Sequence, residues 1–142
     1  MDAESLKSLV SEKMWQQTSS RLKSAETIEV MRELFDYAVD RFAPRLDDIK
    51  VQDERAISFF SSGREILTIN VTRKDLRIYI HPPAGAFFEP EQDFDVERFS
   101  LWKGSFQKKS GRYRAMSVWI SEKKYLLAVK RIIDRIPTRI GE

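Results

Sequence analysis

The chain has 142 residues, of which 42% are hydrophobic and 33% are charged, and this composition is typical of one globular domain. It contains no cysteine, which excludes disulfides, thiolate catalysis and cysteine-ligated metal centres. The net charge of +3 is unevenly divided: residues 103–142 hold eleven Lys or Arg against three acids, whereas residues 1–102 hold fourteen against nineteen. The N-terminal segment lacks the features of a signal peptide and no apolar run is long enough for a membrane helix, so we expect a cytoplasmic protein with a single domain over residues 1–142.

Two helices are predicted before the first strand. Residues 2–17 carry a narrow apolar stripe at helical spacing, so residues 1–20 are expected to form a peripheral helix and a linker. Residues 25–42 carry a broad apolar face. Ser24 is expected to cap this second helix and Pro44 to end it.

Residues 56–81 predict a three-strand antiparallel meander. Apolar residues alternate with polar ones in two successive runs, which are separated by the charged turn at residues 73–75. The Ser61-Ser62-Gly63 segment supplies the preceding reversal, and an edge strand is expected at residues 49–51. The face opposite the helices is expected to carry polar and aromatic side chains: Ser58, Phe60, Thr68, Asn70, Arg77, Tyr79 and His81.

The remaining chain predicts two more strands and a closing helix. A loop is expected at residues 84–97, a strand at 98–106, a turn at 108–111 and a strand at 113–120. Ser121 is then expected to cap a helix that Pro137 ends. The whole predicts an α+β fold: a mainly antiparallel sheet of about five to six strands, with two N-terminal helices and one C-terminal helix packed on one face.

The order of several segments resembles small uncharacterised α+β domains of bacteria. The segments are LRIYIHP, DFDVERFS and YRAMSVWISEKKYLLAVKRII, with Gly104 before a basic turn and Ser121 at the start of the last helix. Domains of this kind occur alone or at the ends of predicted transport and restriction-type proteins. The resemblance spans residues 47–136; it implies the α+β architecture and transfers no catalytic residue.

The single histidine, His81, lies at a strand end before two prolines. A histidine that acts as a general base needs a partner that orients it, and a carboxylate of the loop at residues 84–97 could be that partner. The alternative is a histidine in partial contact with solvent. The chain has no Gly-x-Ser-x-Gly turn that would favour a serine hydrolase.

Four carboxylates alternate with other residues in the loop that follows His81. In an extended conformation they would lie on one face, where a divalent cation would relieve their repulsion. The spacing does not match a calcium loop, because Val96 stands at the required glycine and Trp102 at the required final acid. A solvated acidic loop is therefore favoured, and no metal or cofactor is predicted. The four are Glu91, Asp93, Asp95 and Glu97.

Residues 103–114 carry five cations, no acid and two aromatic residues. Cations suit phosphates and rings suit stacked bases, so this segment and the basic face of the C-terminal helix indicate nucleic-acid binding. A charged hairpin that protects a sheet edge is the alternative. The residues concerned are Lys103, Lys108, Lys109, Arg112, Tyr113 and Arg114.

We expect, first, a non-enzymatic binding or protein-interaction module. Its recognition surface would be the open sheet face with the following loop. Nucleic-acid binding is the second hypothesis, and a small acid–base enzyme that uses His81 and a loop carboxylate is the third. Trp15, on the narrow-striped first helix, is a candidate anchor for a protein partner or a second copy. The surface residues are Tyr79, His81, Phe88, Asp93 and Asp95.

Overall fold

The computed structural model describes residues 2–81, 108–109, 112–113, 116–134 and 136. The helices are α1 (Ala3–Lys7), α2 (Glu12–Ser19), α3 (Ala25–Phe42) and α5 (Leu126–Asp134), with short 3-10 turns η1 (Ala43–Arg45) and η3 (Lys123–Tyr125). The strands are β1 (Asp48–Gln52), β2 (Ala56–Ser61), β3 (Arg64–Val71), β4 (Leu76–Ile80), β5 (Lys108–Lys109), β6 (Arg112–Tyr113) and β7 (Met116–Ile120).

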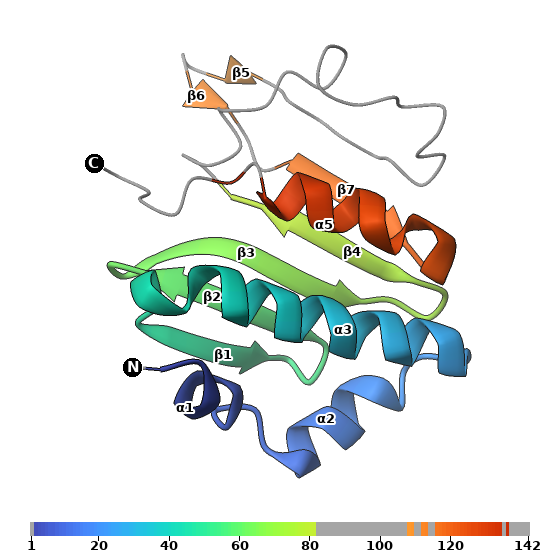
Figure 1. Ribbon diagram of the computed structural model, residues 1–142. Helices are drawn as coiled ribbons and strands as arrows, with labels where there is room; N and C mark the ends of the chain where they lie inside the picture. The colour runs from blue at the N-terminus through green and yellow to red at the C-terminus, as the bar shows by residue number, and fades with distance from the viewer. Residues whose placement is uncertain (1, 82–107, 110–111, 114–115, 135, 137–142) are drawn as a thin grey trace.

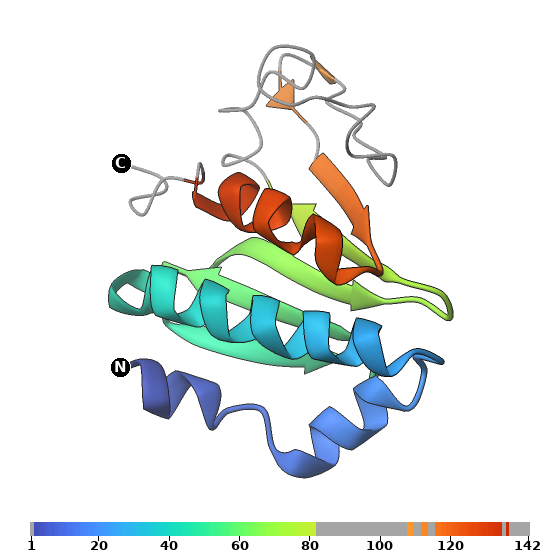
Figure 2. The same cartoon turned by 45° about the vertical axis from the view of Figure 1, so that its right-hand side comes forward.

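One antiparallel sheet, with the strand order β1-β2-β3-β4-β7, organises the molecule. Helices α3 and α5 lie side by side across one face of it, and α1 and α2 follow the β1 side of α3 (Figures 1 and 2). The short strands β5 and β6 form a second, two-stranded antiparallel sheet. This arrangement confirms the predicted α+β fold, and no described helix is long and apolar enough to cross a membrane.

The core lies between the sheet and the helices. Because the strands pair in register, Ile57, Ile69, Ile78 and Val118 form a continuous row across four strands, and each is at most 1% exposed. Helix α3 turns eight buried residues toward this layer. The predicted alternation in β3 and β4 is therefore confirmed, with the apolar set facing the helices.

Two tight turns complete the meander as predicted. Ser62 and Gly63 both have positive φ, at 52° and 74°, which suits the twist of a two-residue hairpin. The Gly63 amide donates to the Asp47 carboxylate at 3.0 Å. In the β3–β4 turn, the Thr72 hydroxyl donates to Asp75 Oδ1 at 2.6 Å.

The predicted helix over residues 2–17 is divided into α1 and α2. Ser11 interrupts it, because its hydroxyl accepts the Met14 amide (3.2 Å) and so starts a new helix. Trp15 on α2 is only 5% exposed and meets the ring of Phe35 edge-on, with centroids 4.8 Å apart. Trp15 therefore belongs to the core, and Met14 is an exposed apolar side chain on the same helix; binding of a partner or a second copy through this helix stays a prediction.

Ser121 does not cap the closing helix. The helical turn η3 begins after Glu122, with no side-chain cap. Instead, the Ser121 carbonyl accepts from the Thr27 hydroxyl (2.9 Å) and the Lys123 amide donates to Glu26 (3.0 Å). Helix α3 thus provides the polar partners at the start of the last helical segment.

Candidate functional site

A β-bulge between β2 and β3 changes which residues face away from the helices. Phe59 pairs with Leu67, but the next residue, Phe60, pairs with Glu65, so Ile66 is an extra residue in β3. In a regular strand, residues two apart lie on the same face, so without the bulge the Glu65 side chain would point toward the helices, as Leu67 does. With it, the Glu65 carboxylate lies on the open face of the sheet.

There Glu65 joins Ser58, Thr68 and His81, which we name the Glu65 cluster. Ser58 Oγ donates to Glu65 Oε1 at 2.9 Å, and the Thr68 hydroxyl donates to the same oxygen. Since the Thr68 proton is used in this way, its oxygen accepts from His81 Nε2 at 2.8 Å, which assigns the proton of neutral His81 to Nε2. The same nitrogen lies 3.2 Å from Glu65 Oε1.

The electrostatics of the cluster favour a charged glutamate beside a neutral histidine. Burial alone would raise the pKa of Glu65, but hydrogen bonds from Thr68 and Ser58, with the neighbouring His81, hold it below its ordinary value. Burial lowers the pKa of His81 and outweighs the attraction of Glu65. Every polar atom that converges on Glu65 Oε1 therefore has a suitable partner.

This geometry does not match a catalytic triad. In a triad the histidine uses one ring nitrogen for the nucleophile and the other for the acid. Here a single nitrogen, Nε2, contacts both Thr68 and Glu65, and both hydroxyls donate to the carboxylate. Ser58 and Thr68 are also 0% and 6% exposed. The cluster is suited to holding strands β2, β3 and β4 together.

Further along the same face, cationic and aromatic side chains lie together. The Arg77 guanidinium lies 3.4 Å from the centre of the Trp119 ring, and we name these two side chains the Arg77–Trp119 pair. Arg77 also donates a hydrogen bond to the Tyr79 hydroxyl at 3.0 Å. The ring of Tyr79 stacks on His81 at 6.3 Å. Arg77, Tyr79, His81 and Trp119 are all half-buried.

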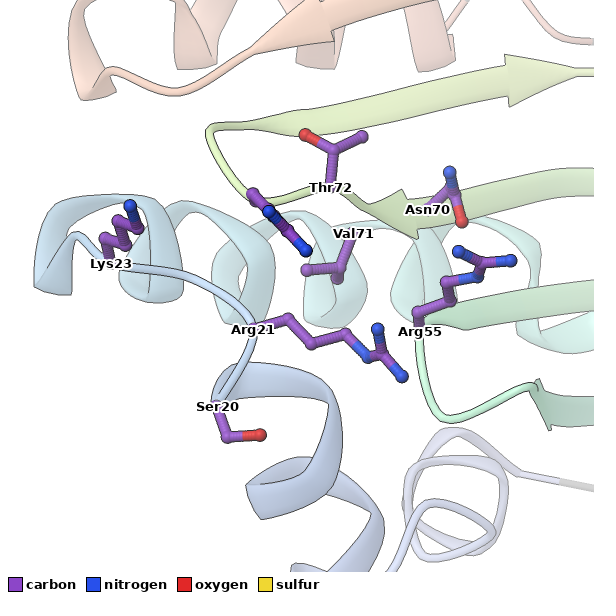
Figure 3. Close-up of a pocket in the computed structure, with 8 residues that line it drawn as sticks. Ser20, Arg21, Lys23, Arg55, Asn70, Val71 and Thr72 are labelled. Carbon is purple, nitrogen blue, oxygen red and sulfur yellow. The ribbon is translucent and has the colours of Figure 1, made fainter.

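A cavity with several basic residues in its lining lies at the end of the sheet where β3 stops (Figure 3). Its volume is about 590 Å³, within the range of small-molecule sites. We name it the cationic pocket. Four of its lining residues are cations and none is an acid; the lining is Ser20, Arg21, Lys23, Arg55, Asn70, Val71, Thr72 and Arg73.

Three separate segments build the pocket, and each is anchored by a neighbouring contact. In the α2–α3 linker, Leu22 is 7% exposed, while Arg21 and Lys23 on either side of it are exposed. The Arg55 carbonyl before β2 accepts the Val71 amide at 2.7 Å, which joins Arg55 to the end of β3. Figure 3 shows Arg21 reaching from the linker across the cavity toward Arg55.

The pocket cations differ in their pairing from the lysines of the closing helical segment that face α3. Within the described part of the chain, none of the four forms an ion pair or a side-chain hydrogen bond. On the closing helical segment, by contrast, Lys123 pairs with Glu29, and Lys130 lies 3.7 Å from Glu33. Four like charges that share one cavity repel each other, and a multivalent anion would remove that repulsion.

The residues predicted to form a recognition surface are only partly described. Tyr79 and His81 lie together on the open face, as expected. Phe88, Asp93 and Asp95 lie outside the described residues, as do Lys103 and Arg114. The backbone of β5 and β6 is described but its side chains are not, so the binding role of these residues stays a prediction: Lys108, Lys109, Arg112 and Tyr113.

Sequence reasoning did not find the partner of His81 or the pocket. Glu65 occupies the apolar phase of the β3 alternation, and a carboxylate at such a position is a signal that the phase changes. For the pocket, the pattern of Arg21 and Lys23 around an apolar residue was available in the sequence. Nothing local indicates that Arg55 and Arg73 lie at the same cavity. Among the described residues, no three metal-ligating side chains come together.

Comparisons with protein-family models, curated proteins and solved structures gave no match, so the resemblance to bacterial α+β domains stays a prediction.

Proposed function

We propose that this protein is a non-enzymatic binding module whose ligand carries several closely spaced anionic groups, such as phosphates, and binds in the cationic pocket. The observation that carries this proposal is that Arg21, Lys23, Arg55 and Arg73 line one cavity whose lining contains no acid. Charge-assisted hydrogen bonds from guanidinium and ammonium groups are the usual means of holding phosphate. The side-chain amide of Asn70 adds a neutral donor for its oxygens.

The other hypotheses have less support from the described residues. The second hypothesis is nucleic-acid binding by residues 103–114 together with the closing helix. The positive charge of that helix is partly neutralised, because Lys123 and Lys130 face acids of α3. An acid–base enzyme based on His81 is disfavoured because its Nε2 atom is engaged with Thr68 and Glu65. The absence of cysteine supports our placement of the protein in the cytoplasm.

The direct test is calorimetric titration of the full chain with inorganic tripolyphosphate at low salt. Wild-type protein should bind, and the double variant Arg55→Glu, Arg73→Glu should lose binding, because the net charge of the pocket cations falls from +4 to zero. Arg64→Glu is the matched control. Arg64 is also exposed, but it starts β3, at the end opposite the pocket.

The expected result is binding that Arg64→Glu leaves unchanged and that the double variant abolishes. Equal affinity of the double variant and the wild-type protein would show that the pocket is not the site. Failure of the wild-type protein to bind tripolyphosphate or any other polyanion would overturn the proposed function.

A further inference from the structure

Resting on the proposed function, we propose that the ligand of the cationic pocket is a single-stranded nucleic acid, with its phosphates in the pocket and an adjoining base stacked on the Arg77–Trp119 pair. The juxtaposition of the two features carries this step. Asn70 lines the pocket and pairs directly with Arg77 across β3 and β4. Arg77 in turn pairs with Trp119 across β4 and β7.

These pairings place the stacking surface within reach of a ligand held in the pocket. Neighbouring strands lie about 4.8 Å apart. Arg77 is therefore one strand away from the pocket residue Asn70, and Trp119 is two strands away. Asn70 and Arg77 both lie on the open face. A strand that leaves the pocket at Asn70 therefore meets the guanidinium of Arg77 without crossing to another face.

The chemistry of the pair fits a nucleobase better than it fits a bare polyanion. Single-stranded chains are bound by cations that follow the phosphates and by planar groups on which unpaired bases stack. The Arg77 guanidinium over the Trp119 ring provides a planar cation, and Tyr79 holds it through the 3.0 Å hydrogen bond. A duplex keeps its bases stacked inside, so this surface would have nothing to contact.

The competing class of ligand is an acidic peptide or an inorganic polyphosphate. Either would satisfy the four pocket cations, but a polyphosphate has no ring, and an acidic peptide of Asp and Glu residues has none to place on the Arg77–Trp119 pair. Changes at Arg77 therefore separate these ligands from nucleic acid, whereas changes at Arg55 and Arg73 affect all of them.

The experiment measures fluorescence anisotropy of a labelled short oligothymidylate with the full chain, across a range of salt concentrations. A duplex of equal length and unlabelled tripolyphosphate serve as comparisons. We expect the single strand to bind more tightly than the duplex. With four phosphate contacts, the logarithm of its affinity should fall with the logarithm of salt concentration at a slope of about 3.

Two variants of one residue test the stacking step. Arg77→Gln should weaken oligonucleotide binding about tenfold, since one stacked base contributes affinity of that order. Arg77→Lys keeps the charge but not the plane, so it should weaken binding about as much as Arg77→Gln, and both variants should keep the salt slope that the four pocket cations set. Both variants should bind tripolyphosphate like the wild-type protein. Lys124→Gln, which removes a cation from over the Tyr125 ring outside the open face, is the matched control.

Three results would overturn the inference and leave the pocket proposal standing. They are equal binding of single strand and duplex, unchanged oligonucleotide affinity in Arg77→Gln, and binding of tripolyphosphate without binding of the oligonucleotide. If no polyanion binds, the proposed function fails as well. Circular dichroism of each variant distinguishes lost binding from lost folding.

Discussion

The two ends of strand β3 place charged groups in opposite circumstances. Near its start, the Glu65 carboxylate accepts hydrogen bonds from Ser58 and Thr68 and lies 3.2 Å from His81. At its finish, Arg73 and three other cations line a cavity with no acidic residue in its lining. The Glu65 charge near the start is stabilised by hydrogen bonds within the fold, whereas the pocket cations at the finish have no acid in the cavity lining and can bind an anionic ligand.

This difference separates stabilising from binding roles. A buried polar group with all its partners contributes to the folded state, and its removal leaves the partners unsatisfied. Exposed like charges that share one cavity oppose each other and contribute nothing to folding. Variants at the Glu65 cluster should therefore change stability, and variants at the cationic pocket should change ligand affinity.

The largest expected effect is stabilisation by a pocket ligand. Tripolyphosphate at about 100 times its dissociation constant should raise the free energy of unfolding by about 2.7 kcal/mol, because it binds only the folded chain. Urea denaturation with and without the anion measures this. The increment should vanish in Arg55→Glu, Arg73→Glu and persist in Arg64→Glu; an equal increment in all three proteins would assign the anion to another site.

Removal of the acceptor from the Glu65 cluster comes next. Glu65→Ala should lower the free energy of unfolding by about 2 kcal/mol, because Ser58, Thr68 and His81 lose a shared partner. Asp36→Ala removes an exposed carboxylate from α3 and should change stability by less than about 0.5 kcal/mol. Equal effects of the two substitutions in urea denaturation would contradict a stabilising role for the cluster.

A smaller effect concerns pH. Folded His81 has a pKa below its ordinary 6.5 because burial opposes its charge, so the folded protein binds fewer protons than the unfolded chain as pH falls through that value. The folded pKa of Glu65 is also low, and its contribution is lost below its ordinary 4.5. Thermal unfolding should therefore show a Tm that falls by a few degrees between pH 6.5 and 4.5 because of His81, and that falls further below pH 4.5 because of Glu65.

His81→Gln tests the source of that slope. The amide of glutamine can still donate to Thr68, but it does not titrate. The variant should lose most of the decline in Tm that begins near pH 6.5. An unchanged decline would assign the pH dependence to other groups.

The smallest effect has the opposite sign from that of Glu65→Ala. Arg73→Gln without ligand removes one of four like charges, so the free energy of unfolding should stay constant or rise by about 0.5 kcal/mol. The same variant should weaken tripolyphosphate binding. A clear loss of stability would mean that Arg73 has a structural partner and would weaken the contrast between the two ends of β3.

The fold could be predicted largely from local patterns. The alternation in β3 and β4 and the turns after Ser61 and Val71 depend on neighbouring residues, and all are present. The division of the first helix at Ser11 was missed because the apolar spacing continues past it, although a serine cap signal stands there. The start of the closing helix was misassigned to Ser121 because its partners lie on α3, far away in the sequence.

The candidate site was harder to predict because it depends on pairing between distant segments. Glu65 meets His81 only because a bulge shifts the strand register. The pocket needs the α2–α3 linker, the turn before β2 and the end of β3 to come together. Each segment is an ordinary basic loop when read alone, and the sequence does not specify the shared cavity.

The bulge at Ile66 also divides β3 into two parts whose side chains alternate in opposite phase. Before Ile66 the odd-numbered position faces solvent, and after it the odd-numbered positions face the helices. A related sequence that lacks Ile66 would pair without a bulge, and its glutamate, now directly before Leu67, would still lie opposite Phe60 on the open face. The extra residue therefore allows β3 to bury Ile66, turn Leu67 toward the helices and still present the Glu65 carboxylate on the open face, which a regular strand could not do because its residues two apart share a face.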